Sequence, residues 1–304
     1  MELRALRINT HLTRILLGTS ILVALLSHTA MAVKYPITLT DCRGKAVTIP
    51  REPQRIISTA PSNTEILFAL GLDSHIAAVG TWDNYPAAAS RKPKIGDYIT
   101  SIERVLILHP DLVLAHGELN IQAIEGLERH GVRVFALNPK TIDEVQRDIL
   151  RVGTITNRET QARVVVSRIK SAKEQVLLKT KNIRSKPGVL FSIQADPLWA
   201  AGPQTFVDEM IRLAGGTNLA ADAKPGYREF SSEAAVRHHP DVIICTDKGG
   251  REVYTRGIWK STNAARNGRV YETNPDYVVR PGPRLAVGIL NIARLIHPEL
   301  FKGK

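Results

Sequence analysis

The sequence has 304 residues, of which 43% are hydrophobic and 23% charged, and its formal net charge is +12. Such a surplus suits an anionic partner, but Lys and Arg are spread along the whole chain, without the dense basic run or interleaved aromatics of nucleic-acid readers. Composition therefore argues against a nucleic-acid partner, and no apolar run reaches the ~20 residues that a membrane-spanning helix needs.

The first predicted element is an export signal. Three arginines precede an apolar run over 15–26, and the small-residue stretch 29–32 follows it. This order of regions predicts a signal peptide over 1–32, cleaved after Ala32; a buried N-terminal helix is the alternative. With no Cys at the cleavage position we expect no lipid anchor, and we expect the mature protein, with a formal charge of +10, in the periplasm.

Behind the signal, short β-branched runs alternate with helical stretches, which is typical of parallel sheets with helices on their faces. The strand runs are apolar throughout, as expected of strands buried on both faces. The predicted strands are 55–59, 76–79, 112–115, 132–137, 189–193, 242–245 and 269–272, and the clearest predicted helices are 63–70, 102–108 and 207–214.

Part of this pattern occurs twice. The segment 103–114 returns as 233–244, with Glu, His, Pro and Asp all displaced by 130 residues, and the pair 133–134 returns later as 269–270. A period this long is not that of a solenoid, which repeats every ~20–50 residues. It predicts two similar lobes with a groove between them, and grooves at domain interfaces are favoured ligand sites.

One segment breaks the alternation. Over 159–182 there is no strand signal, and apolar residues recur every three or four positions from Ala162 to Val176, as in an amphipathic helix. We predict that this helix joins the lobes and limits them to small rocking, because a helix resists bending where a loop does not. The predicted fold is α/β, two similar lobes with mainly parallel sheets joined by a single long helix, organised as signal 1–32, N-terminal lobe 33–155, bridging helix 156–186 and C-terminal lobe 187–304.

Aromatic residues make up only 5% of the chain, yet they concentrate just after predicted strands or just before the repeated helices. In open parallel sheets the ligand lies beyond the carboxyl ends of the strands, where rings offer a large contact area with few rotors to freeze. Some of them could cap lobe edges instead. The candidate ligand-binding residues are Trp82, Tyr85, Tyr98, His116, Trp199, Tyr227, Tyr277 and Arg280.

Two of these candidates bring polar chemistry. His116 could stack, form a hydrogen bond or reach a metal centre, or it could be an ordinary solvent-facing loop residue. The fork of donors on Arg280 suits a ligand carboxylate, phosphate or amide carbonyl, and it equally suits the backbone of the opposite lobe.

Glu103 and Glu233 fall in the first turn of the two repeated helices, where a carboxylate complements the helix dipole. Thr100-Ser-Ile-Glu103 fits a capping box. Capping does not explain why both lobes keep the glutamate. The two cysteines, Cys42 and Cys245, fall in different lobes, so we predict unpaired, buried thiols.

Taken together and in order, the motifs resemble the substrate-binding proteins of ATP-driven importers for cobalamin, iron siderophores and haem. The resemblance covers essentially the whole mature sequence. It rests on 55–71, 81–86, 102–103 and 109–113 in the first lobe and on 201–206, 213–218, 267–271 and 280–284 in the second. It implies two α/β lobes bridged by one long helix, and a monomer without a cofactor that hands a small molecule to an ABC permease dimer.

Within this family, the stretches 82–86 and 280–284 look most like cobalamin binders, so we expect a corrinoid, with a ferric siderophore or haem as the alternatives. The position of His116 carries an aromatic residue in the cobalamin binder that the chain resembles, so His116 is a departure. The resemblance also implies that Glu103 and Glu233 meet arginines of the two permease subunits, as rim charges that set encounter rate and register.

No catalytic or metal-binding motif competes with this interpretation. The sequence contains no Gly-x-Ser-x-Gly elbow, Walker loop, dinucleotide-binding fingerprint, His-Glu-x-x-His or Cys-x-x-Cys. A dedicated metal site needs three or four converging ligands, and only His116 and Asp196 fall near the predicted cleft. We therefore predict a binding protein without a metal site, and a secreted enzyme with a site between the lobes is the distant alternative.

Overall fold

The computed structural model describes residues 34–96 and 99–301, so the predicted signal peptide and Tyr98 lie outside the described residues. From residue 35 onward the chain forms one compact unit. It opens with an antiparallel hairpin of β1 (Ile37–Thr40) and β2 (Ala46–Ile49). The alternating Ile-Thr-Leu-Thr of β1 is a half-buried strand pattern that the sequence analysis did not use.

The first sheet is parallel and its strands lie in the order β4-β3-β5-β6. Its strands are β3 (Ile56–Ser58), β4 (Ile76–Ala78), β5 (Leu112–His116) and β6 (Val134–Leu137), and the helices between and after them are α2 (Pro61–Ala69), η1 (Asp73–His75), α3 (Ala87–Ser90), α4 (Ile102–Ile107), α5 (Ile121–Arg129) and α6 (Ile142–Ile155). The strands are buried almost throughout, as their continuous apolar sequences predict.

The second sheet repeats this plan with additions. Its main path is β10-β8-β7-β11-β12, with β9 on the first residues of β7. The strands are β7 (Gly188–Ala195), β8 (Leu198–Ala201), β9 (Thr217–Asn218), β10 (Tyr227–Glu229), β11 (Val242–Cys245) and β12 (Val270–Glu272), and the helices are α8 (Phe206–Leu213), α9 (Ser232–Arg237), α10 (Gly250–Val253), η2 (Gly257–Ser261), α11 (Asn263–Arg266), α12 (Pro275–Val278), α13 (Leu285–Ile296) and η3 (Pro298–Leu300). Strands β8 and β10 pair antiparallel and are additions that the sequence analysis did not predict.

The aspartate of the sequence repeat has the same structural role in both lobes. The Asp111 carboxylate accepts hydrogen bonds from the backbone N–H of Gln54 and Arg55, 2.8 and 3.0 Å away, just before β3. The Asp241 carboxylate accepts from the N–H of Gly188, 2.8 Å away, at the start of β7. Each aspartate therefore fixes the register of the two central strands, β3 with β5 and β7 with β11.

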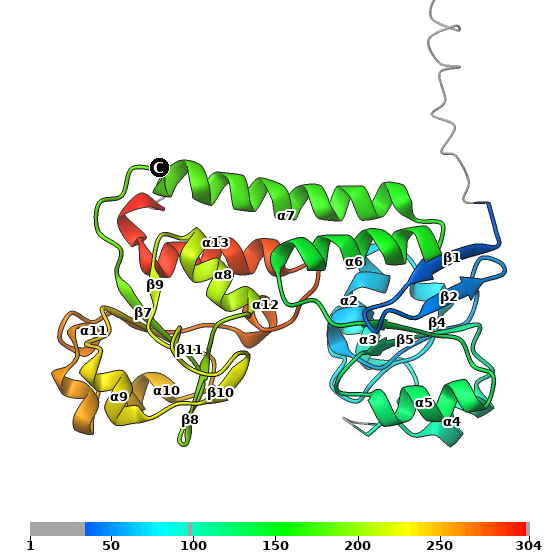
Figure 1. The fold of residues 1–304 in the computed structure, drawn as a ribbon, viewed down its shortest axis with the longest axis horizontal. Helices are drawn as coiled ribbons and strands as arrows, with labels where there is room; N and C mark the ends of the chain where they lie inside the picture. Colours follow the sequence, from blue (N-terminus) through cyan, green and yellow to red (C-terminus); the bar gives the residue numbers. More distant parts are fainter. Residues whose placement is uncertain (1–33, 97–98, 302–304) are drawn as a thin grey trace, which may run out of the picture. The chain divides into compact units, whose positions relative to one another are not determined.

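The long helix is α7 (Glu159–Thr180), and it packs along α6 of the first lobe and α13 of the second (Figure 1). Its buried residues recur at helical spacing: Ala162, Val165, Val166, Ile169, Ala172, Val176 and Thr180. The predicted fold, two similar α/β lobes joined by one long helix, is confirmed, and the proposed lobe limits at 155 and 187 remain a prediction.

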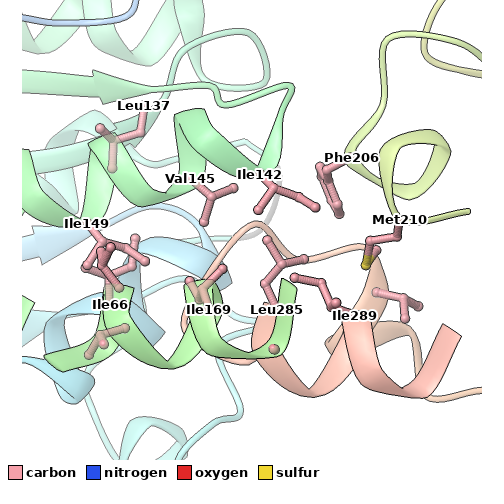
Figure 2. Close-up of a cluster of buried hydrophobic side chains, with 14 of the residues drawn as sticks. Ile66, Leu137, Ile142, Val145, Ile149, Ile169, Phe206, Met210, Leu285 and Ile289 are labelled. Carbon is pink, nitrogen blue, oxygen red and sulfur yellow. The ribbon is translucent and has the colours of Figure 1, made fainter. Parts of the chain in front are cut away.

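The two lobes share a hydrophobic core. One buried apolar cluster runs from the first lobe through α6 and α7 into α8 and α13, so that Ile142, Phe206 and Leu285 belong to it together (Figure 2). Separate clusters lie around Val113 in the first sheet and around Ile243 in the second. The lobes therefore share the core beneath α7, because α6, α8 and α13 all turn apolar faces toward it.

Polar contacts reinforce this junction. The Glu209 carboxylate of α8 accepts a hydrogen bond, at 2.7 Å, from the N–H of Ile142 at the first turn of α6, where a negative charge complements the helix dipole. Lys173 of α7 reaches both Asp143, at 3.2 Å, and Glu209, at 3.7 Å. Three helices are thus joined at one point.

The cysteine prediction is half correct. Both thiols are unpaired, but only Cys245 is buried, whereas Cys42 is exposed. Cys42 follows β1, and its backbone N–H donates a hydrogen bond to the carbonyl of Ala136 in β6, at the edge of the first sheet.

Candidate ligand-binding cleft

A cavity of about 240 Å³ lies at the carboxyl ends of β3 and β5, with one residue of the second lobe closing it. Of the predicted ligand-binding residues it contains Trp82, His116 and Arg280. Its complete lining is Thr59, Ala60, Pro61, Gly80, Thr81, Trp82, Asp83, His116, Leu119, Asn120 and Arg280. The expectation that the ligand lies beyond the carboxyl ends of the strands therefore locates the cavity. The same expectation points to Thr59 and Asn120, which were not proposed because they are not aromatic.

Asn120 holds the floor of the cavity together. Its side-chain oxygen accepts from the Thr59 hydroxyl at 2.6 Å and from the His116 N–H at 3.1 Å, and its own N–H donates to the His116 carbonyl. The ends of β3 and β5 are thus tied to each other by one amide side chain, which makes this wall of the cleft pre-formed.

Asp83 fixes the loop that carries Trp82. Its carboxylate accepts from the Thr64 hydroxyl of α2 and from the Gly80 N–H at 3.1 Å, and it is only 2% exposed. Burial raises the pKa of Asp83 to about 6, although these hydrogen bonds and the nearby Lys94 and Arg280 oppose the shift. The Trp82 ring, 56% exposed, therefore stands on a rigid turn at the mouth of the cavity.

His116, the last residue of β5, presents one edge of its ring to its own loop. Its Nδ1 accepts from the backbone N–H of Glu118 at 3.3 Å and of Leu119 at 3.2 Å. Burial and the charge of Lys140 lower the pKa of His116, since both disfavour the charged imidazolium.

Beside the cavity, an ion cluster that we call the latch joins the lobes. It consists of Glu65 from α2, Asp276 from α12, and Arg280 and Arg284 from the segment before α13. Glu65 receives two hydrogen bonds from Arg284, at 2.8 and 2.6 Å, and one from Arg280 at 3.2 Å. The Glu65 side chain is only 2% exposed. In the latch two carboxylates balance two guanidinium groups, and the loss of any one of them would leave a poorly solvated charge without its partner.

The Arg280 guanidinium contacts three protein side chains: it donates to Glu65 and to Asn84, the latter at 2.9 Å, and it pairs with Asp276 at 3.0 Å. The alternative that Arg280 contacts the opposite lobe is what the structure shows. The contacts are to the side chains of Glu65 and Asn84 and not to the backbone. The ligand-binding role of Arg280 remains a prediction, supported by its place in the cavity wall.

Tyr85 and Tyr277 flank the latch rather than the cavity. The Arg284 guanidinium lies 4.1 Å from the Tyr85 ring centre and 5.3 Å from that of Tyr277, close enough for cation–π attraction. One ring comes from each lobe, so both tyrosines help to hold the lobes at this contact.

The other aromatic candidates lie apart from the cavity. Trp199 is half-buried on β8, paired with Gln194 and Glu229, because the predicted loop after β7 is a hairpin. Tyr227 lies on β10 and packs against the shared core, with a buried hydroxyl that has no hydrogen-bond partner among the described residues. Tyr98 lies outside the described residues. Ligand contact by these residues, and by Tyr85 and Tyr277, stays a prediction.

Glu103 and Glu233 are exposed and have matching surroundings. Ser101 and Ser231 cap their helices, and their hydroxyls donate to Glu103 and Glu233 at 3.0 and 2.9 Å. Hydrogen bonds to backbone and to these serines lower the pKa of both glutamates. The predicted capping box is wrong, since Ser101 and not Thr100 is the cap; Thr100 is buried and accepts from Asn120 instead.

Within the described part of the chain, no three His, Cys, Asp or Glu side chains gather into a group that could hold a metal ion. None of the helices described there is long and apolar enough to cross a membrane.

Residues 56–277 match the family model of periplasmic binding proteins, and the chain belongs to that family. The uncharacterized ABC transporter substrate-binding lipoprotein YvrC of Bacillus subtilis is 36% identical over 276 residues, which cover 88% of each chain. A cobalamin-binding protein of Halobacterium salinarum is 26% identical over 280 residues, 88% of this chain and 75% of its own.

Among solved structures, the periplasmic haem-binding protein RhuT of Roseiflexus, in its apo form, matches 81% of this chain and 99% of its own, with a TM-score of 0.72 and 26% identity. Family and neighbours are solute-binding proteins, which confirms that the chain is not an enzyme. It is the substrate-binding component of an ABC transporter, with a small-molecule ligand and a permease partner.

Proposed function

We propose that this protein binds a corrinoid, cobalamin, in the cleft between its lobes and delivers it to an inner-membrane permease. The observation that carries the proposal is the half-exposed Trp82 ring on its rigid turn beside the strand-end cavity. A large ring held toward a cleft offers a stacking surface, and a broad, flat macrocycle is the kind of ligand that uses one. The kinship with a protein named for cobalamin binding supports this choice.

The size of the cavity agrees with partial enclosure. At about 240 Å³ it is smaller than the ~300–1,000 Å³ typical of drug-sized ligands, and a corrinoid is larger still. We therefore propose that only part of the ligand enters the cavity while its macrocycle lies along Trp82 and the apolar Leu119, which is 61% exposed.

The location we propose is extracytoplasmic, with export by the segment 1–32. The family and a relative named as a lipoprotein support it. We also propose that Glu103 and Glu233 contact the permease, since one exposed glutamate per lobe is held in the same way by a serine.

Binding is tested by mixing the purified protein separately with cyanocobalamin, a ferric siderophore and hemin, recording visible spectra and titrating each hit by calorimetry. We expect stoichiometric cyanocobalamin binding that weakens when Trp82 is replaced by Ala. The matched control is Trp259→Phe, because Trp259 is buried in the second lobe away from the cavity. Micromolar or weaker cobalamin binding beside nanomolar siderophore or hemin binding would overturn the choice of ligand.

A further inference from the structure

The protonation pattern of His116 is determined by its own loop. Two backbone N–H groups, those of Glu118 and Leu119, point at its Nδ1, 3.3 and 3.2 Å away. A ring nitrogen that accepts N–H hydrogen bonds carries no proton, so the proton of the neutral imidazole is on Nε2. His116 is thereby a hydrogen-bond donor at Nε2.

The Nε2–H group has no partner among the described residues, and His116 lines the cavity. Neighbouring polar groups are already engaged. Thr59 donates to Asn120, Thr81 donates to the Gly96 carbonyl at 2.9 Å, and Arg280 is held in the latch. A ligand group that enters beside His116 therefore meets a donor held in place by the backbone.

We propose that His116 binds the cargo by donating a hydrogen bond from Nε2 and does not coordinate the metal of a corrinoid or a haem. This inference rests on the proposed function and narrows it, because it requires an acceptor on the cargo, an amide carbonyl or a carboxylate. Coordination through Nε2 needs a lone pair there, so the proton would have to move to Nδ1. An N–H at Nδ1 would face two backbone N–H groups and leave both without their acceptor.

The test compares ligands that differ in one axial position. Aquacobalamin has an exchangeable water on cobalt, whereas cyanocobalamin does not. A donor at His116 predicts similar affinities for both and no change in the aquacobalamin spectrum on binding; a coordinating histidine predicts a spectral change and tighter binding of aquacobalamin alone. The same reasoning predicts no histidine-ligated spectrum with hemin.

The matched variant is His116→Asn, whose side-chain oxygen takes the place of Nδ1 as acceptor for the loop while the Nε2 donor is removed. Loss of one hydrogen bond should weaken cobalamin binding roughly tenfold, with an unchanged melting temperature. Equal affinity of wild type and His116→Asn would overturn the proposal.

Failure of the proposed function can be told apart from failure of this inference. Absence of cobalamin binding by the wild type refutes the corrinoid, and the same variant is then measured with whichever of hemin or the ferric siderophore binds. The ring itself is read in the free protein by long-range proton–nitrogen NMR. A proton found on Nδ1 would refute the donor role whatever the ligand.

Discussion

Single residues in the cleft differ in how far their roles follow from the sequence. Trp82 and His116 were predicted because they follow apolar strands, and both line the cavity. Glu65 was not, since a carboxylate inside the apolar α2 looks like any helix residue until Arg280 and Arg284, more than 200 positions later, are placed beside it. Asp83 was missed for a similar reason, because its burial depends on Thr64 and Gly80.

Asp83 should make stability depend on pH. Its folded-state pKa, about 6, lies above the ordinary value of 3.8, so the folded protein binds this proton more tightly than the unfolded chain. Stability should therefore fall as pH rises from about 4 to about 6, by on the order of 3 kcal/mol. In Asp83→Asn this part of the slope should vanish, as measured by urea unfolding between pH 4 and 7.

Asp73→Asn is the control, because Asp73 forms an exposed ion pair with Lys92. Some slope should persist in Asp83→Asn, because burial also raises the pKa of Asp148 to about 6. An identical pH profile in wild type and Asp83→Asn would contradict the assignment.

At the level of elements, the parallel strands β3 to β7, β11 and β12 were predicted, whereas the hairpin strands β1 and β2 and the added strands β8, β9 and β10 were not. The runs 56–57, 112–115, 189–191 and 242–245, which form most of β3, β5 and β11 and the first half of β7, are buried, and their sequences are continuously apolar. Strand β10 reads Tyr-Arg-Glu and is half-exposed at a sheet edge. The chain reversal around residues 196–197 places β8 beside β7, and β10 then pairs with the free edge of β8. The composition of β10 does not indicate this pairing.

Only the buried face of helix α7 should contribute strongly to the stability of the protein. Ile169 is fully buried in the shared core, between residues of both lobes (Figure 2), so Ile169→Ala should destabilise the protein by about 2–5 kcal/mol. Leu178→Ala, on the same helix but 66% exposed, should change the free energy of unfolding by less than about 0.5 kcal/mol. Chemical denaturation measures both.

Because both lobes contribute to this cluster, tryptophan fluorescence and far-UV circular dichroism should give the same midpoint in Ile169→Ala. Two separated transitions would mean that the lobes unfold independently and that the core is not shared.

Helices α4 and α9 occupy equivalent places in the two lobes and carry Glu103 and Glu233, which leads to a prediction about transport. Charge reversal at Glu103 or Glu233 should lower ligand-dependent stimulation of the permease ATPase by at least ~10-fold, since rim charges act on encounter and register, and leave ligand affinity unchanged. Glu125→Lys, also exposed and in the first lobe on α5, is the control. A loss of ligand affinity would show that the two glutamates serve the cleft or the fold instead.

For the whole molecule, the repeat predicted the topology but not the junction. A displacement of 130 residues shows that each lobe repeats the other, and the matching strand pairs bear this out. How the lobes meet depends on Ile142 with Phe206 and Leu285, and on Glu65 with two arginines. None of these contacts joins equivalent positions of the repeat, so the similarity of the lobes carries no information about them.

The lobes are held at two places, the shared core under α7 and the latch beside the cavity. Glu65→Gln leaves Arg280 and Arg284 with Asp276 as their remaining carboxylate. Removing one partner of a buried ion pair typically costs ~3–5 kcal/mol of stability. Part of this cost is recovered if the arginines that have lost their carboxylate move into water. We therefore expect Glu65→Gln to lower stability by about that amount and to widen the cleft by a small rocking motion, since α7 still limits the lobes.

Spin labels on exposed Gln122 of the first lobe and Lys260 of the second, placed in a Cys42→Ser background, report the separation of the lobes by pulsed electron resonance. The distance between them should lengthen and its distribution broaden in Glu65→Gln, but not in Asp73→Asn, which removes an ion pair within one lobe. Saturating ligand should restore the shorter distance, because contacts to both walls of the cleft replace the lost pair. An unchanged distribution would mean that the shared core alone sets the spacing of the lobes and that the latch only adds stability.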